Sequence, residues 1–382
     1  MFQTEVNKVS ECITTSLTNV FNHILVKEQF VRIIMFPQCD DKYVFLNLTI
    51  NCVLNVTSPN TSSVDNTNRF ERVIELYVIS ILCFFGLIGN ILSVIVLQRD
   101  RDRREALFLL QALAFADTFH LLVAVNRYPL KYLIQEVSYV SMQLIVYPLL
   151  KTTQAMTVWM MLLVTTDRYI YVCRPLVAHQ LCNSRTRRIL ALLVFVLSFV
   201  YNIPRFFDSC LWTFQDKCTG KIYSRRVFTR AFSSVYYFDI YQTGAYLLLI
   251  FIGPLPILIV LNYKLLTAIR RSRRRQRQYA LCHMWQQPPH QSEANASIVL
   301  INVVIVFVIC QTPELIFKIL VIVDRWLPHV HVISANATLD FSTMSELLLV
   351  INSSVNFLIY CAFGRRFRHI MKETFRSMSH NM

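Results

Sequence analysis

The residues of this chain that could do chemistry are ionisable side chains inside long apolar runs. Asp167 and Arg168 stand together where one such run ends. At helical spacing before Arg168, one face of that run carries Thr165, Met161, Thr157, Gln154 and Lys151. Lipid offers no partner to a polar face of this kind. We therefore expect this helix to line the interior of a bundle, with a polar pocket at one end and Arg168 at the other.

The elements that must position these groups are membrane helices. The chain has 382 residues, of which 54% are hydrophobic and 16% are charged, and this is too apolar for an ordinary soluble domain. A helix of about 20 apolar residues crosses a bilayer, and continuous apolar runs favour helices over a closed barrel. Seven runs qualify: 74–97, 106–125, 144–166, 189–204, 241–263, 296–317 and 341–363. The predicted fold class is an all-α seven-transmembrane helix bundle with a short amphipathic eighth helix.

The basic residues predict the orientation of this bundle. Arginines cluster after the first, third, fifth and seventh runs, and the positive-inside rule places these connections in the cytoplasm. Residues 205–240 carry six basic residues on the other side, but four segments outweigh one. The regions are then an extracellular segment (1–70), the bundle (71–363) and a cytoplasmic tail (364–382). We expect a plasma-membrane location, and the net charge of +15 then reflects topology rather than nucleic-acid binding.

The outer segments carry residues typical of an extracellular surface. Triplets that accept N-linked glycans begin at Asn47, Asn55, Asn60 and Asn336. Five of the eleven cysteines would lie outside, and this odd number prevents complete pairing. We predict a disulfide between Cys210 and Cys218. The alternative is a bridge from the N-terminal segment to the same loop.

A carboxyl group in the middle of the second helix predicts a small cation site. Asp117 ends the sequence Leu113-Ala-Phe-Ala-Asp117, and hydroxyl and amide oxygens lie at compatible depths on other helices. The predicted site consists of Asn90, Asp117, Thr157, Asn352 and Ser353. It suits an allosteric sodium ion, and no other metal or cofactor is expected. The alternative is a neutral Asp117 that bonds to Asn90 and only holds the helices together.

Five motifs resemble those of the rhodopsin-like (class A) G-protein-coupled receptors, in order. They are Gly89-Asn90, Leu113-Ala-Phe-Ala-Asp117, Asp167-Arg168-Tyr169, Phe307-x-x-Cys310-x-x-Pro313 and Asn356-x-x-x-Tyr360. More narrowly, Val172-Cys-Arg-Pro175, Asn202-Ile-Pro-Arg-Phe-Phe207 and Cys310-Gln-Thr-Pro313 resemble the invertebrate FMRFamide-type neuropeptide receptors. The resemblance implies a receptor for an extracellular amidated peptide that acts on a heterotrimeric G protein.

The resemblance also implies a switch at the inner ends of the helices. In such receptors the arginine at the position of Arg168 is held by the adjacent aspartate, here Asp167, and often by a glutamate of helix six, here Glu293. Release of this latch would let helix six move outward and expose Arg168 to the G protein. The alternative is that Glu293 only caps its helix. Tyr169, Asn356 and Tyr360 complete the predicted switch.

The chain departs from the family pattern at several positions. Most members have a cysteine twenty-five residues before this arginine that bridges to the second outer loop. Here the residue is Gln143, and residues 84–172 contain no cysteine, so the usual disulfide cannot form. Two further departures lie in other helices. Gln311 replaces a common aromatic residue of helix six, and Phe357 replaces the proline of helix seven.

The ligand pocket is predicted to open outward above Asp117. Its inward-facing polar residues are Lys151, Gln154, Gln311, Glu314, Lys318 and Glu346. Two acids among apolar walls suit a cationic group, such as the Arg-Phe-amide end of a peptide. The alternative is that Lys151 pairs with Glu314 or Glu346 only to avoid an unpaired charge.

Other functions have weaker support in the sequence. A receptor of the same fold for a different peptide or a chemosensory ligand is the main alternative. A secondary transporter would show internal repeats and interrupted helices, and we find neither. No nucleophile motif or metal-spaced cluster indicates an enzyme.

Overall fold

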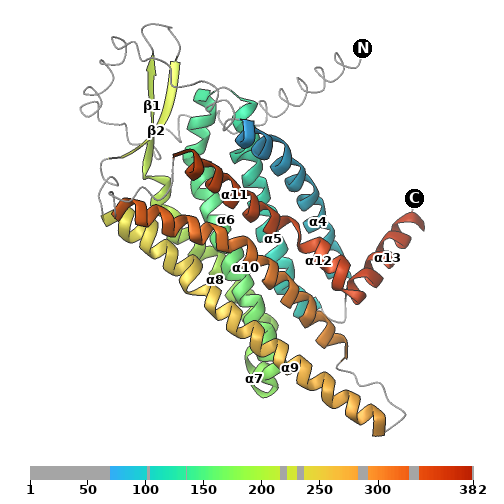
Figure 1. Cartoon of the computed structure of the whole chain (residues 1–382). Helices are drawn as coiled ribbons and strands as arrows, with labels where there is room; N and C mark the ends of the chain where they lie inside the picture. The colour runs from blue at the N-terminus through green and yellow to red at the C-terminus, as the bar shows by residue number, and fades with distance from the viewer. Residues whose placement is uncertain are drawn as a thin grey trace.

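The structure is a computed structural model that describes residues 69–100, 104–134, 136–215, 222–229, 236–282, 291–326 and 335–380. Long helices lie side by side in one bundle (Figure 1). They are α4 (Ile79–Arg99), α5 (Arg104–Arg127), α6 (Glu136–Cys173), α8 (Ser184–Asn202), α9 (Pro254–Cys282), α10 (Gln291–Trp326), α11 (Ala335–Ser354) and α12 (Asn356–Phe363). π-Helical turns at Val73–Val78 precede α4, and others at Tyr237–Ala245 and Leu247–Ile252 precede α9. Shorter pieces are the 3₁₀ helix Pro129–Tyr132 and α7 (Pro175–Leu181).

The lengths and apolar surfaces of these helices are those of a multi-pass membrane protein. In the described part of the chain, five helical segments are long and apolar enough to cross a membrane, and the pair α11 and α12, bent by 47°, makes a sixth. Outward faces carry large apolar side chains, such as Phe85 at 65% exposure. Lipid, rather than another part of the chain, covers such a face. The predicted helical bundle is therefore confirmed.

Helix α6 occupies the middle of the bundle. It is 38 residues long and packs against α5, α8 and α9, and also against both strands of the hairpin described below. It is not among the five spans that pass the length and hydropathy test, because polar residues such as Lys151 and Gln154 interrupt its apolar sequence. Most of the predicted inward face is buried: Thr157 and Gln154 are each 3% exposed and Thr165 is fully buried, whereas Lys151 is partly exposed. The polar residues of this helix are thus turned mainly toward its neighbours in the bundle.

A β-hairpin that was not predicted from the sequence follows α8 in the otherwise helical structure. Strand β1 (Ser209–Gln215) pairs antiparallel with β2 (Ile222–Phe228), with Ser209 opposite Phe228. Aromatic and β-branched residues in both strands suit a pleated surface. Figure 1 shows the hairpin at one end of the bundle. It rests on α6, where the Arg226 guanidinium lies 4.3 Å from the centre of the Tyr147 ring.

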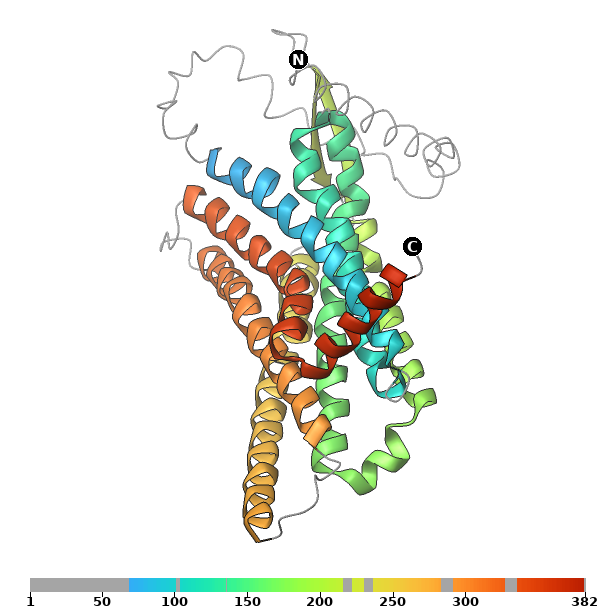
Figure 2. The same cartoon turned by 90° about the vertical axis from the view of Figure 1, so that its right-hand side faces the viewer.

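The amphipathic helix α13 (Arg365–His380) crosses α4 in Figure 2. Phe367, Ile370 and Met371 pack against the bundle core. Phe375, one turn further along the helix, is 49% exposed. A bidentate ion pair fixes the start of the helix, because the Arg366 guanidinium lies 2.5 and 2.8 Å from the two carboxylate oxygens of Asp100 at the end of α4.

Two glycines allow α4 to approach its neighbours closely. A Cβ atom at Gly86 would lie 2.6 Å from Ser354 Oγ and 2.7 Å from Leu121 Cδ1. A Cβ atom at Gly89 would lie 2.8 Å from Phe357 Cβ. Small residues at such crossings are typical of membrane helix packing.

Replacing Gly86 with valine should lower the melting temperature of the purified protein in detergent. The added side chain fits only if α4 moves away from α5 and α11, and overpacking of this kind costs about 1–3 kcal/mol. Ile91→Val, on the exposed face of the same helix, is the control and should change stability by less than about 0.5 kcal/mol. Equal losses in both variants would contradict the packing argument.

Candidate functional site

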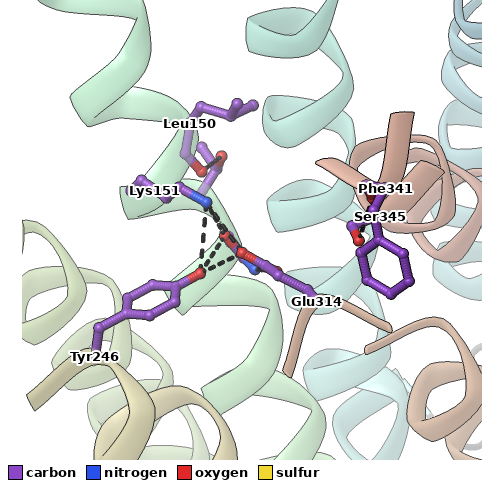
Figure 3. A network of polar contacts seen from close by, with 8 residues as sticks. Leu150, Lys151, Tyr246, Glu314, Phe341 and Ser345 are labelled. Carbon is purple, nitrogen blue, oxygen red and sulfur yellow. Dashed lines mark hydrogen bonds and ion pairs between the residues drawn. The ribbon is translucent and has the colours of Figure 1, made fainter. Parts of the chain in front are cut away.

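Four polar side chains from three helical segments meet inside the bundle, one turn from the hairpin contact at Tyr147 (Figure 3). Lys151 and Gln154 come from α6, Glu314 from α10, and Tyr246 from the stretch between the two π-helical segments before α9. Lys151 Nζ lies 3.1 Å from Glu314 Oε1 and 3.2 Å from Gln154 Oε1. The Gln154 amide donates to the other Glu314 oxygen. Lys151 therefore pairs with Glu314, one of the two acids considered from the sequence.

Tyr246, which was not among the predicted site residues, completes this network. Its hydroxyl lies 2.8 Å from Glu314 Oε1 and 2.9 Å from Gln154 Oε1, and its side chain is buried. π-Helical turns such as those on either side of Tyr246 widen a helix and occur often at functional sites. No local pattern in the sequence indicates that this tyrosine, rather than its neighbours, turns toward α6. Long-range packing decides it.

The other predicted pocket residues lie around the network without joining it. Gln311 is 2% exposed, and its Oε1 has no hydrogen-bond partner. Lys318 Nζ lies 5.7 Å from the centre of the Tyr246 ring. Glu346 is partly buried and lies within electrostatic range of Arg127, a guanidinium at the end of α5. Arg127 donates to Gln143 at 2.7 Å, so an ionic contact region adjoins the predicted pocket.

The predicted cation site is a compact cluster around Asp117, which is fully buried. Thr157 Oγ1 and Ser353 Oγ donate to Asp117 Oδ1 at 3.3 and 3.1 Å. Asn356 Nδ2 donates to Oδ2 at 2.6 Å, so a residue predicted for the inner switch belongs instead to this cluster. Asn90 does not bond to Asp117 but donates to the Ser353 carbonyl at 2.9 Å, which leaves Asn90 Oδ1 without a partner.

The remaining cluster residue, Asn352, is buried but does not bond to Asp117. In the described part of the chain, no group of three or more His, Cys, Asp or Glu side chains could hold a metal ion. The chemistry available at Asp117 is therefore that of one carboxylate with neutral oxygen and amide groups. This set suits a hard monovalent cation better than a transition metal.

At the inner end of α6, Asp167 is shared between two arginines. Arg187 of α8 donates to it with Nε at 2.7 Å and Nη2 at 3.5 Å, whereas Arg168 Nε lies 3.8 Å away. Arg187 is 6% exposed and was not predicted as a site residue. The contact expected between Asp167 and Arg168 is thus present but is the weaker of the two.

The structure describes two of the remaining predicted switch residues. Tyr169 is partly buried, and Tyr360 is buried with its ring centre 5.5 Å from that of Phe367. Glu293 belongs to α10, but its side chain lies outside the described residues, so its latch with Arg168 stays a prediction.

Most of the predicted disulfide and glycan positions lie outside the described residues. Cys210 is disulfide-bonded, but Cys218 lies outside the described residues, so this pairing stays a prediction. The sites at Asn47, Asn55 and Asn60, and the side chain of Asn336, also lie outside them.

The buried ion pair generates a stability prediction. Lys151→Met or Glu314→Gln should each lower stability by about 3–5 kcal/mol, because each leaves one buried charge unpaired. The double variant should lose less than the sum, with a coupling energy of about 1–3 kcal/mol. Thermal unfolding of the purified protein and its three variants measures this cycle. Additive losses would show that the two charges do not depend on each other.

Comparison with known proteins places this geometry in a family. The pattern of the seven-transmembrane receptors (rhodopsin family) matches residues 89–360. An FMRFamide receptor of Drosophila melanogaster is 28% identical over 312 residues, which cover 79% of this chain and 54% of the relative. An FMRFamide peptide receptor of Caenorhabditis elegans is 26% identical over 304 residues, covering 77% and 67%. The sex peptide receptor of Drosophila melanogaster is 26% identical over 332 residues, covering 81% and 74%.

The chain spans about half the length of the Drosophila FMRFamide receptor that it matches. The match to the family pattern runs from Gly89 and Asn90 in α4 to Tyr360 in α12. It therefore includes both the buried network on α6 and the cluster around Asp117. The chain belongs to the rhodopsin family of seven-transmembrane receptors.

Proposed function

We propose that this protein is a receptor for an extracellular neuropeptide, of the FMRFamide-like amidated class, and that it acts on a heterotrimeric G protein. The observation that carries the proposal is the buried network of Lys151, Glu314, Gln154 and Tyr246. It joins α6, α10 and the segment before α9 at one place. A ligand that competes for Glu314 or Lys151 changes how these helices are held together.

The relatives support the peptide class of the ligand. Two of the relatives described above are FMRFamide receptors and the third is a sex peptide receptor. An Arg-Phe-amide end carries a guanidinium that a buried carboxylate binds strongly, together with an aromatic ring. Glu314 and Glu346 are the acids available to it, and Tyr246 offers a ring face.

Signal transmission depends on α6, because it connects the network to Asp167 and Arg168. Breaking the contacts of Glu314 with Lys151 and Gln154 frees α10 from α6 at this depth. Outward movement of α10 then exposes Arg168 to the G protein. Such a movement needs two helix packings that differ by only a few kcal/mol.

The cluster at Asp117 fits a sodium ion that biases this equilibrium. Asp117, Thr157 and Ser353 provide oxygen atoms, and Asn90 Oδ1 is a buried acceptor that no protein group satisfies. The bend between α11 and α12 lies at Ser354 and Val355, between two residues that bond to Asp117. A bound cation would hold the two halves of this bent helix against α5.

The arginine distribution supports a plasma-membrane receptor with its N-terminus outside. The glycan acceptors at Asn47, Asn55 and Asn60 and a disulfide at Cys210 agree with this orientation. The same fold serving a different peptide or a chemosensory ligand is the alternative.

Cells that express the receptor should respond to at least one member of a library of amidated Arg-Phe peptides, in a G-protein or calcium assay. Glu314→Gln or Glu346→Gln should lower the potency of that peptide by about tenfold, since a charged hydrogen bond is lost. Surface expression is measured for each variant. Silence from every peptide at confirmed surface expression would remove the ligand class, and unchanged potency in both variants would remove the pocket.

Arg187→Gln should lower basal signalling and agonist potency by about two- to tenfold, a coupling of about 0.5–2 kcal/mol. Without Arg187, the Asp167 carboxylate becomes available to Arg168 alone and holds it in the resting position. Arg188→Gln is the matched control, because its side chain is exposed and lies on another face of α8. A rise in basal signalling in Arg187→Gln would show that Arg187, not Asp167, restrains the receptor.

A further inference from the structure

Arg205 is a buried arginine whose donors are not fully used. It lies in the 3₁₀ helix Ile203–Phe206 after α8 and is 3% exposed. Its guanidinium carbon is 5.2 Å from the centre of the Tyr241 ring and 5.5 Å from that of Tyr246. Its Nε and Nη2 atoms are buried without a hydrogen-bond partner. From the sequence, Arg205 is one of six basic residues of the predicted outer segment 205–240, and the structure shows that its side chain is buried.

The acid nearest in sequence to Arg205 bonds to other residues. Asp208, three residues later, accepts from Arg226 Nη2 at 3.3 Å, from Tyr237 at 3.1 Å and from Gln242 at 3.1 Å. No ion pair formed among the described residues includes Arg205. The ring faces of the two tyrosines offset part of its desolvation. They do not satisfy the two N–H groups, and a buried donor without an acceptor is costly.

Positive charge is in excess around Tyr246. The ring centre has Lys151 Nζ at 5.4 Å, Arg205 at 5.5 Å and Lys318 Nζ at 5.7 Å. Glu314 is the only carboxylate that forms an ion pair with any of the three in the described part of the chain, and its partner is Lys151. Tyr201 and Tyr241 hydrogen-bond to Arg205, and Glu314 acts on Lys318 at a distance, but neither cation forms an ion pair with a carboxylate among the described residues. Burying unpaired charges is expensive, so an anion from outside the chain would stabilise this arrangement.

The unused donors of Arg205 indicate which anion fits. Nε and Nη2 lie on one edge of the guanidinium, and this fork matches the two oxygens of a carboxylate. We infer that the peptide site takes a carboxylate group of the ligand at Arg205, with Lys318 beside it. This inference rests on the proposed function. It adds an acidic group to a ligand for which the sequence indicated only a cationic end.

The carboxylate has two sources in a peptide: an acidic side chain, or a free chain terminus in place of the amide. Both use the same chemistry at Arg205. A receptor that reads such a group would discriminate among peptides that share the Arg-Phe end, because only those with the acid satisfy the buried guanidinium.

The test uses Arg-Phe-amide peptides that differ by one residue, Asp or Asn, at each position before the Arg-Phe end. In receptor-expressing cells, the Asp peptide at one position should be at least about tenfold more potent than its Asn partner. Arg205→Gln should reduce this ratio to less than about threefold, and so should Arg205→Lys, which keeps the charge but loses the fork. Arg188→Gln should keep the ratio. The same peptides with a free carboxyl terminus form the second arm.

The outcomes separate the inference from the proposed function. The peptide with a free carboxyl terminus can prove more potent than the amidated peptide, and Arg205→Gln can abolish this preference. That result would support the carboxylate site and refute the proposal that the ligand is amidated. The inference would be overturned if the peptides with and without the carboxylate were equally potent in both arms, or if a preference for the carboxylate survived in Arg205→Gln. The proposal that the protein is a peptide receptor would still stand.

If no peptide activates the receptor, the melting temperature of the purified full chain tests whether the carboxylate site exists. N-acetyl-aspartate amide should then raise the melting temperature of the wild type more than N-acetyl-asparagine amide does, and this difference should vanish in Arg205→Gln. No difference in the wild type would refute the site.

Discussion

The structure depends on one constraint: polar groups inside a membrane bundle need partners within the protein. Helix α6 carries such groups along its whole buried face, from Lys151 at one end to Asp167 at the other. Lipid supplies neither donors nor acceptors, so each polar group on α6 requires a group from a neighbouring helix. This requirement places α6 in the middle and arranges the other helices around it.

The polar contacts of α6 fall into three clusters at different depths. The cluster nearest the hairpin, predicted to be the outer one, joins α6 to α10 through Glu314. The middle cluster joins α6 to α5 through Asp117, and the third, at the opposite end, joins it to α8 through Arg187. Between the clusters, apolar residues such as Met161 and Val158 are fully buried. Polar contacts in a low-dielectric interior are strong and directional, so each cluster favours discrete helix positions.

The hairpin and the segment before α9 make the outer cluster different from the other two. Asp208 and Arg226 fix the hairpin against Tyr147 of α6, and tyrosines from the segment before α9 cover the cations beneath. The result is an outer site in which rings and guanidinium groups lie close together and the carboxylates are already bonded. A ligand that enters such a site has to exchange contacts rather than fill an empty space.

The chain by itself determined the parts of the protein that follow from local properties. Apolar run length predicts the membrane helices, and a period of 3.6 residues identifies the buried face of α6 and the position of Asp117. Spacing along one helix also placed Lys151 and Gln154 on the same side as Thr157. These features depend on residues within a few turns of each other, so the sequence contains them.

Only the tertiary structure decided which distant groups meet. Tyr246 was missed because nothing near it in the chain shows that it turns toward Glu314, and Arg187 because its partner Asp167 lies on another helix. The hairpin was missed because its strand pairing is set by contacts between two segments and with α6. Asn356 was assigned to the switch by its motif, whereas the bend between α11 and α12 directs its amide to Asp117. From the sequence, Arg205 is predicted to be a charged residue of a loop, but it is buried beside the rings of Tyr241 and Tyr246. Burial depends on which residues pack over a side chain, and the local sequence does not show this.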